Sequence, residues 1–450
     1  MLASLYTKWG KYLKGATRKM TSKLPLVVIL GSTGSGKTKL SLELATKFGG
    51  EIVGADSMQI YKGLDVASAK ATPQEISTVP HHMINILEPH QMFTVLAYRN
   101  MVLPIIEEIF NRGNFPIIVG GTNYYIESIL WKILVQNPGE EVIKDCGIFP
   151  NKEHELPNEV LHEKLKKLDP VMANRLHPNN RRKVLRSLEV LYQKGKKHSD
   201  ILEEQCSNSK SGGGLRFKNV IVLWLQCDQV CLDQRLDSRV DNMIQEGLLD
   251  ELLHFHKEYN EKRLMDGRDS DYSRGIFQSI GFKEFHSYLI MSNSEKESEE
   301  GQKILQQAVD QLKIVTRRFS KKQTKWTMNR FLGRRDREVP PIYGLNTTDI
   351  SKWSENVIQP AVHILESYIS ETNCNIDPLP MRDTNSVPNT LDETFVCEIC
   401  NRVFIGTLQW TTHIKSRRHR MVLERKKKQN DEKNSMKNCE NLTTEIERVS

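Results

Sequence analysis

The segment 31–38 constrains the fold of this chain more than any other. It reads Gly-Ser-Thr-Gly-Ser-Gly-Lys-Thr, which has the spacing G-x-x-x-x-G-K-T. An apolar run rich in β-branched residues, 24–30, precedes it, and a segment with Leu40 and Leu44 on one helical face follows it. Glycines between a strand and a helix let backbone amides point inward as an anion site, and the start of the helix adds its dipole. The sequence therefore predicts a phosphate-binding βα unit.

The side chains of this loop have predicted roles of their own. Lys37 is expected to meet phosphate oxygens, and the Thr38 hydroxyl is expected to help hold Mg²⁺. The motif indicates a diphosphate or a triphosphate, but it does not indicate ATP. The predicted diphosphate-binding residues are Gly31, Ser32, Thr33, Gly34, Ser35, Gly36, Lys37 and Thr38.

Further apolar segments predict the rest of the fold. Short strands are expected at 51–55, 115–119 and 220–225, with helical segments between them. Apolar strands that alternate with helices are typical of a parallel sheet covered on both faces. Residues 140–215 are mostly charged and helix-prone. The predicted fold class is therefore α/β, a P-loop parallel sheet core with a helical insertion domain at about 140–215.

Asp56 is the candidate general base. The run 115–119 ends in Gly-Gly-Thr and lacks the second acidic strand end that nucleotidases use to hold Mg²⁺. The carboxylate stands instead after the strand at 51–55, at Asp56. Ligands of open α/β sheets bind at the carboxyl ends of the strands, so Asp56 could take a proton from a group that attacks the phosphate ester. Capping of a turn is an equally good interpretation of its position.

The C-terminal region predicts a metal site. Cys397, Cys400, His413 and His419 have the spacing C-x2-C-x12-H-x5-H, which falls within the range of zinc fingers. Four protein ligands make a closed structural Zn²⁺ site, and Phe395 and Phe404 suit the core of a small ββα finger. Basic residues, among them Arg417 and Arg418, follow the helix of the finger and favour nucleic acid as its partner.

The first residues form a basic, acid-free leader. No Asp or Glu occurs before Glu43, whereas five Lys and Arg residues lie within residues 1–19 opposite an apolar helical face. This composition predicts import into mitochondria, with a cytosolic and possibly nuclear pool that starts at Met20. A solvated basic tail that touches RNA is the alternative interpretation.

The 450 residues thus divide into a sequence of predicted regions. The net charge is +8, and no apolar run approaches the length needed to cross a bilayer, so no membrane partner is expected. The eight cysteines are too few for a disulfide framework and favour a reducing compartment. The predicted regions are a leader at 1–22, a core at 23–369, a linker at 370–392, a zinc finger at 393–425 and a disordered basic tail at 426–450.

Seven short motifs resemble those of the tRNA dimethylallyltransferases, which are also called tRNA isopentenyltransferases. They occur in the order of that family and span about residues 25–335, and the C-terminal finger resembles the animal branch. The motifs lie at 54–65 with 69–72, at 80–82, 119–125, 177–182, 186–190 and 278–284, and from 316 through 323 to Trp326.

The resemblance implies a reaction and roles for individual residues. The P-loop would hold dimethylallyl diphosphate, with Thr33 and Lys37 neutralising its charge. Asp56 would accept a proton from the N6 amine of an adenine beside the anticodon, at tRNA position 37, as this amine attacks the allylic carbon. The residues implied to contact tRNA are Asp56, Ser57, Met58, Gln59, Thr122, Arg181, Arg182, Lys183, Arg186, Arg317, Arg318, Lys321 and Lys322.

The sequence departs from the family pattern at one position, and it also allows two other functions. Gln278 stands where bacterial relatives carry Arg, so Lys283 or Arg274 is expected to substitute. A P-loop kinase or ATPase would also use residues 31–38, although the second acidic strand end is missing. An RNA-binding adaptor would depend on the finger and the basic tail, and Arg181 and Arg182 could be a solvated helix face. We expect the enzyme to act as a monomer.

Overall fold

The computed structural model describes most of the chain, in two compact units. The described residues are 24–132, 156–207, 214–267, 272, 274–333, 338–381, 393–400 and 402–426. The first unit takes its described residues from 1–138 and 211–382, and the second from 139–210 and 383–450. The predicted leader, and the tail beyond residue 426, lie outside the described residues.

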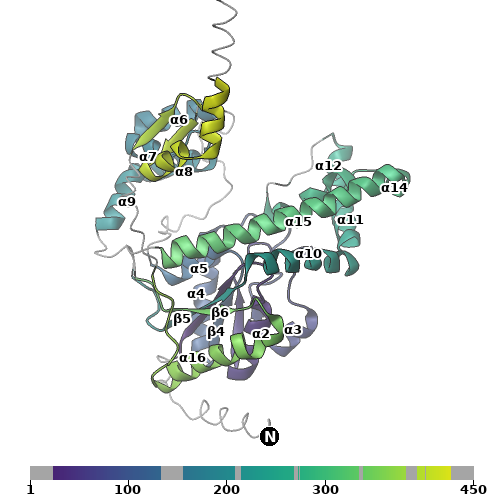
Figure 1. The fold of residues 1–450 in the computed structure, drawn as a ribbon, viewed down its shortest axis with the longest axis vertical. Helices are drawn as coiled ribbons and strands as arrows, with labels where there is room; N and C mark the ends of the chain where they lie inside the picture. The colour runs from purple at the N-terminus through teal and green to yellow at the C-terminus, as the bar shows by residue number, and fades with distance from the viewer. Residues whose placement is uncertain are drawn as a thin grey trace, which may run out of the picture. The chain divides into compact units, whose positions relative to one another are not determined.

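A six-stranded parallel sheet forms the centre of the first unit (Figure 1). Its order is β3-β2-β4-β1-β5-β6, so the strand before the P-loop lies in the interior of the sheet. All six strands run parallel, which brings the loops at their carboxyl ends to one edge. The strands are β1 (Leu26–Gly31), β2 (Gly50–Gly54), β3 (His81–His82), β4 (Phe115–Val119), β5 (Val220–Gln226) and β6 (Ile342–Asn346).

Helices cover both faces of this sheet, because alternate residues of each strand are apolar and buried on opposite sides. Leu26, Val28 and Leu30 of β1 join one hydrophobic cluster, whereas Val27 and Ile29 join the other. The helices of this unit are α2 (Lys37–Phe48), α3 (Pro73–Thr78), α4 (Val95–Asn111), α5 (Asn123–Leu130), α10 (Gln229–Gln245), α11 (Leu248–Tyr259), α12 (Glu261–Met265), α13 (His286–Leu289), α14 (Asn293–Glu297), α15 (Glu299–Thr327) and α16 (Gln359–Ser370).

Two layers result from this packing. Helices α2 and α16 contribute to the cluster on one face, and α4, α5, α10 and α15 contribute to the cluster on the other. The long α15 runs across the second layer (Figure 1). Short 3₁₀ or π-helical turns complete the unit: η2 (Gly275–Gln278), η3 (Lys283–Phe285), η4 (Met328–Leu332), η5 (Ile350–Lys352) and η6 (Ser354–Ile358).

The second unit combines the helical insertion with the finger. The insertion has its own small core, in which Leu161, Leu165 and Leu188 are fully buried. The Thr394 hydroxyl of the finger donates a hydrogen bond to the Asn174 carbonyl of the insertion at 2.9 Å. The elements are α6 (Asn158–Leu168), α7 (Pro170–Arg175), α8 (Arg181–Lys194), α9 (His198–Ser207), β7 (Thr394–Cys397), β8 (Arg402–Ile405) and α17 (Thr407–Ile414).

The predicted fold class is confirmed, and the structure adds elements that the sequence pattern did not indicate. Strand β3 was not predicted because it has only two residues, and β6 was not predicted because Gly344 and Asn346 interrupt its apolar pattern. The predicted linker begins as part of the core. Cys374 and Ile376 pack against one hydrophobic cluster, and the Leu379 amide donates to the Ile342 carbonyl beside β6. Among the described residues, no helix is both long and apolar enough to cross a membrane.

Candidate active site

The P-loop adopts a backbone conformation that only glycine tolerates well. Gly34 and Gly36 have φ angles of 78° and 94°, in the left-handed region. A Cβ at Gly34 would lie 2.7 Å from Leu236 of α10, and a Cβ at Gly36 would lie 2.7 Å from the ring of Trp353. The loop is thus held closely between two elements, and Gly36 directly precedes α2, whose first amides carry the positive end of the helix dipole.

Three charged side chains near this loop interact electrostatically. The Lys37 amine donates to the Ser32 carbonyl at 2.8 Å. Burial lowers the pKa of Lys37 to about 8, the negative charge of Asp56 opposes this shift, and the positive charge of Arg239 adds to it. Burial also lowers the pKa of Arg239, again against the charge of Asp56. Two cations and one carboxylate therefore interact across the carboxyl edge of the sheet.

Asp56 lies where the sequence placed it, just beyond the end of β2. Its Oδ1 accepts a hydrogen bond from the Met58 amide at 2.9 Å, which caps the turn that follows. Its other oxygen, Oδ2, would lie 3.0 Å from a Cβ at Gly121. The structure confirms the turn cap, which one oxygen makes, and the other oxygen is directed at the loop after β4. The role of Asp56 as a general base stays a prediction.

Gln323 of α15 connects the P-loop to that second loop. Its Oε1 accepts from the Thr33 amide at 2.8 Å, and its Nε2 donates to the Gly121 carbonyl at 2.9 Å. A Cβ at Gly121 would approach the Gln323 Nε2 to 2.7 Å, so only glycine fits without displacement. One buried amide therefore fixes the distance between the predicted phosphate site and the loop beside Asp56.

The residues predicted to hold the target base form a second connected group. The Thr122 Oγ1 accepts from the Ser57 amide at 2.9 Å and lies 3.1 Å from the Ser57 hydroxyl. The Gln59 Nε2 donates to the carbonyls of Ser68 and Ala69. The structure thus brings Asp56, Ser57 and Thr122 together, while the amide hydrogens of Gln59 hold a neighbouring loop.

The four predicted basic residues of α15 separate into two pairs. Arg317 forms an ion pair with Asp237 of α10, and Lys321 forms one with Asp233 at 2.9 Å. Arg318 and Lys322 are exposed. The structure therefore pairs Arg317 and Lys321 with carboxylates of α10, although Lys321 is exposed as well. Within the described part of the chain, Arg318 and Lys322 are the members of this group without an ion pair.

The basic residues of α8 divide in a similar way within the second unit. Arg181 is half-buried, and its guanidinium donates to the Leu156 carbonyl at 2.6 Å and to the Asn158 side chain. Its role is thus structural in the insertion. Arg182, Lys183 and Arg186 are exposed, and Arg186 has Glu189 at 3.2 Å on the same helix.

Arg239 is the site residue that sequence reasoning missed. It lies on α10 among alternating charges, a pattern that is typical of a solvated helix face. The signal that could have found it is its place beside the buried Leu236 and Val240 on the same helix. Lys283 and Arg274, either of which is expected to substitute for the Arg that Gln278 replaces, are both exposed, and Lys283 has Glu284 at 3.9 Å. Their predicted role is untested, and the cation whose charge acts on Lys37 is Arg239.

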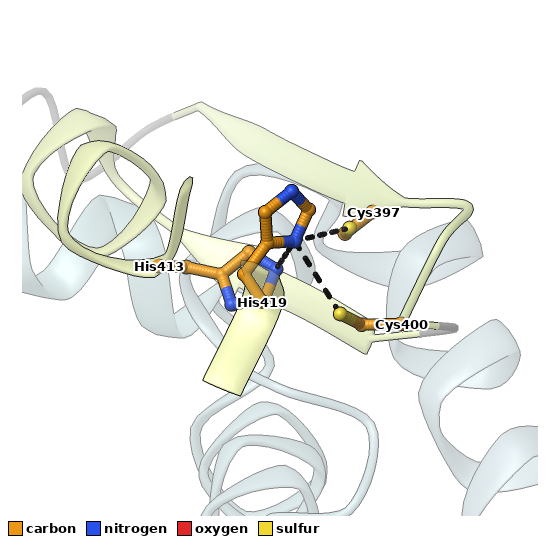
Figure 2. Close-up of side chains that lie close together, drawn as sticks. All are labelled: Cys397, Cys400, His413 and His419. Atoms are coloured by element: carbon orange, nitrogen blue, oxygen red, sulfur yellow. Dashed lines mark hydrogen bonds between the residues drawn. The ribbon is translucent and has the colours of Figure 1, made fainter. Parts of the chain in front are cut away.

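The four predicted ligands of the finger meet at one point (Figure 2). Their donor atoms all lie within 4.8 Å of one another. The His419 Nδ1 lies 3.7 Å from the Cys397 sulfur, 3.4 Å from the Cys400 sulfur and 3.1 Å from the His413 Nε2. A tetrahedral Zn²⁺ with bonds of about 2.0–2.3 Å separates its ligand atoms by roughly 3.3–3.8 Å. The two distances to sulfur lie in this range and the distance between the His nitrogens is slightly shorter, so two thiolates and two imidazoles at these separations fit this ion.

Aromatic packing supports the metal site. The His413 ring stacks on Phe404 with centroids 4.0 Å apart, and Phe395 stacks on Trp410 at 5.3 Å. The predicted ββα finger is therefore formed by β7, β8 and α17. The position of its Cys and His residues was readable from spacing alone, because all four ligands lie within 23 residues of sequence.

Comparison with known proteins places this geometry in a family. A family model described as IPP transferase matches residues 59–330, and one described as isopentenyl transferase matches 24–85. A tRNA dimethylallyltransferase of Homo sapiens is 45% identical over 427 residues, which cover 93% of this chain and 89% of that protein. The chain belongs to the tRNA dimethylallyltransferase family. The predicted resemblance is thus confirmed.

Other tRNA dimethylallyltransferases extend the match. The protein of Schizosaccharomyces pombe is 33% identical, with 92% of this chain and 98% of that protein covered. A crystal structure of a eukaryotic dimethylallyltransferase acting on tRNA has a TM-score of 0.74 and 29% identity, and the match covers 92% of this chain and 100% of that one. A model described as a zinc-finger double-stranded RNA-binding domain matches residues 394–420.

The lowered pKa of Lys37 gives a prediction about proton uptake. A bound diphosphate stabilises the charged amine and raises the pKa of Lys37 above the value of about 8 that burial imposes. Binding should therefore be accompanied by the uptake of at most about one proton at about pH 8.5, and the affinity for diphosphate should fall as the pH rises further. Calorimetric titration with inorganic diphosphate in buffers of different ionisation enthalpy measures this uptake. The Lys37→Arg variant should bind diphosphate without this proton uptake. Equal proton uptake by that variant would show that Lys37 is not the group that takes up the proton.

The finger geometry gives a prediction about metal content. The purified chain should contain about one Zn²⁺, and Cys400→Ser should lose it and open the finger, since structural zinc supplies folding free energy. Metal analysis and hydrogen exchange across residues 394–420 measure both effects. Cys374→Ser, which changes a half-buried cysteine outside the cluster, is the matched control. Full zinc retention by Cys400→Ser would exclude this ligand set.

Proposed function

We propose that this chain transfers a dimethylallyl group from dimethylallyl diphosphate to the N6 amine of an adenine at tRNA position 37. The observation that carries the proposal is the convergence of a P-loop, two half-buried cations and Asp56 at one edge of the sheet. Relatives that match nearly the whole chain are called tRNA dimethylallyltransferases, which supports the same reaction.

The reaction requires a good leaving group and a base. The bond between the N6 nitrogen and the allylic carbon forms as the bond from this carbon to the diphosphate oxygen breaks. The diphosphate leaves with the electron pair, and Lys37, Arg239 and the loop amides stabilise its charge. The N6 proton passes to Asp56, because the lone pair of an adenine amine is delocalised into the ring and the amine is a poor nucleophile without a base.

We further propose that Mg²⁺ accompanies the diphosphate. Thr38 is exposed at the start of α2, beside Lys37, where its hydroxyl can serve as an oxygen ligand. When bound, the ion adds charge neutralisation at the leaving group. Thr33 would contribute its hydroxyl at the same place, while its amide stays bonded to Gln323.

The proposed tRNA contacts come from both units of a single chain. Arg318 and Lys322 of α15 and Arg182, Lys183 and Arg186 of α8 are exposed cations suited to phosphates. The target base must leave the anticodon loop to reach Asp56, at a cost of a few kcal/mol. All proposed catalytic groups belong to the first unit of one chain, so we propose that the enzyme acts as a monomer.

Replacing Asp56 tests the proposed reaction. Purified protein, unmodified tRNA, Mg²⁺ and labelled dimethylallyl diphosphate should give labelled tRNA. Asp56→Asn should lower the single-turnover rate by roughly 10²–10⁴ while the binding of tRNA and diphosphate changes little. Turnover of ATP in place of label transfer would favour a P-loop ATPase, and RNA binding without either activity would favour an adaptor. A variant rate near that of the wild type would remove Asp56 as the base.

We also propose that residues 1–19 direct part of the protein to mitochondria. The support is their composition, with five basic residues, no acidic residue and an apolar helical face. A start at Met20 would leave the strand and the P-loop intact and would produce a second pool, in the cytosol or the nucleus.

Charge reversal in this leader tests the proposed mitochondrial localisation. Changing Lys11, Lys14 and Arg18 to Glu should abolish mitochondrial import, because the membrane potential draws in positive charge. Transfer to tRNA in extracts should persist, since these residues precede the P-loop. Fluorescent fusions of wild type and variant measure the outcome, and identical localisation of the two would rule out a leader.

A further inference from the structure

An exposed pair of aromatic rings lies at the end of α15, outside every role assigned above. Trp326 and Tyr124 have 38% and 40% of their surface exposed. Their ring centroids are 6.3 Å apart with an interplanar angle of 70°. Tyr124 belongs to α5, which contacts α15 (Figure 1). Large exposed aromatic rings that contact each other are uncommon on a surface without a binding role.

A buried carboxylate fixes the orientation of this pair. Glu127 is fully buried, and its Oε1 accepts from the Trp326 Nε1 at 2.6 Å. The Arg330 guanidinium donates to both oxygens of Glu127, at 3.2 Å and 2.8 Å, and lies 5.7 Å from the centroid of the Trp326 ring. Because a buried charge is costly unless it is paired and hydrogen-bonded, this network is rigid. The indole therefore has a fixed direction although more than a third of the residue is exposed.

The pair is adjacent to the candidate active site. Tyr124 follows Thr122 by two residues, and Gly121, whose Cβ position faces Asp56, precedes Thr122 directly. Trp326 lies one turn after Gln323, which donates a hydrogen bond to the Gly121 carbonyl. The two rings thus lie next to the loop that holds the target base in the proposed function.

The charge around the pair favours RNA as its occupant. Lys322 and Lys325 are exposed within one turn of Trp326 on the same helix. Aromatic rings between cations are the arrangement with which proteins bind unpaired nucleotides, because the rings stack on bases and the cations contact phosphates.

We propose that Trp326 and Tyr124 form a stacking platform for an unpaired base of the anticodon loop next to the target adenine. When the adenine leaves the loop, its neighbour loses a stacking partner, and the Trp326 ring replaces that partner. The platform lowers the cost of extruding the target base and sets its register. This inference rests on the proposed function and adds a second base-binding element to it.

A mutant cycle with abasic RNA tests the platform. Binding of an anticodon stem-loop RNA is measured for wild type, Trp326→Leu and Trp326→Phe, with intact RNA and with RNAs that lack one base on either side of the target. Trp326→Leu should weaken binding of intact RNA about 5- to 100-fold, the range expected for loss of one stacked base. The penalty should disappear for one of the abasic RNAs. Trp326→Phe keeps a ring and should retain most of the affinity, although it loses the bond to Glu127.

Lys325→Ala is the matched control on the same helix. Its effect should be equal for intact and abasic RNA and should reduce the salt dependence of binding, whereas Trp326→Leu should leave the salt dependence unchanged. A Trp326→Leu penalty that is the same for all three RNAs, or a Trp326→Phe penalty as large, would overturn the platform. Failure of the wild type to transfer the dimethylallyl group to tRNA would instead overturn the proposed function, so the two failures are distinguishable.

Discussion

The bridge that Gln323 forms between the P-loop and the loop after β4 is the interaction on which the site depends. One side-chain amide accepts from the Thr33 amide and donates to the Gly121 carbonyl. The P-loop follows β1 and Gly121 follows β4, so α15 holds together two loops that the sheet only brings near each other. Because Gln323 is buried, loss of either bond would leave a polar group without a partner, at a cost of about 1–3 kcal/mol.

The electrostatics of the site follow from the same packing. Lys37 and Arg239 are half-buried and close enough for their charges to interact, and partial burial lowers the pKa of both side chains. Ion pairs from Arg317 to Asp237 and from Lys321 to Asp233 fix α10 against α15, and α10 carries Arg239. Arg239 is therefore positioned by ion pairs between two helices, and an anion bound between Arg239 and Lys37 would be stabilised by both cations.

The second unit is stabilised in a different way from the first. A small helical core and a zinc finger pack as one compact unit, joined by contacts such as that between Thr394 and Asn174. Neither part has a large core of its own, so a metal site supplies free energy of folding that apolar burial cannot supply at this size. The exposed basic residues of α8 and of the finger are thereby presented on a single folded unit.

The sequence by itself determined the elements whose chemistry is local. The P-loop, the strand before it and the finger ligands are readable from spacing, because each function needs residues that are close in the chain. Asp56 was readable as a strand end but remained either a base or a turn cap. Only the tertiary structure showed that Gln323 joins two distant loops, that Arg239 belongs to the site and that Arg317 and Lys321 are engaged in ion pairs. These roles depend on which side of a helix meets another helix, and the sequence of an amphipathic helix does not identify the partners of its polar residues before the helices pack.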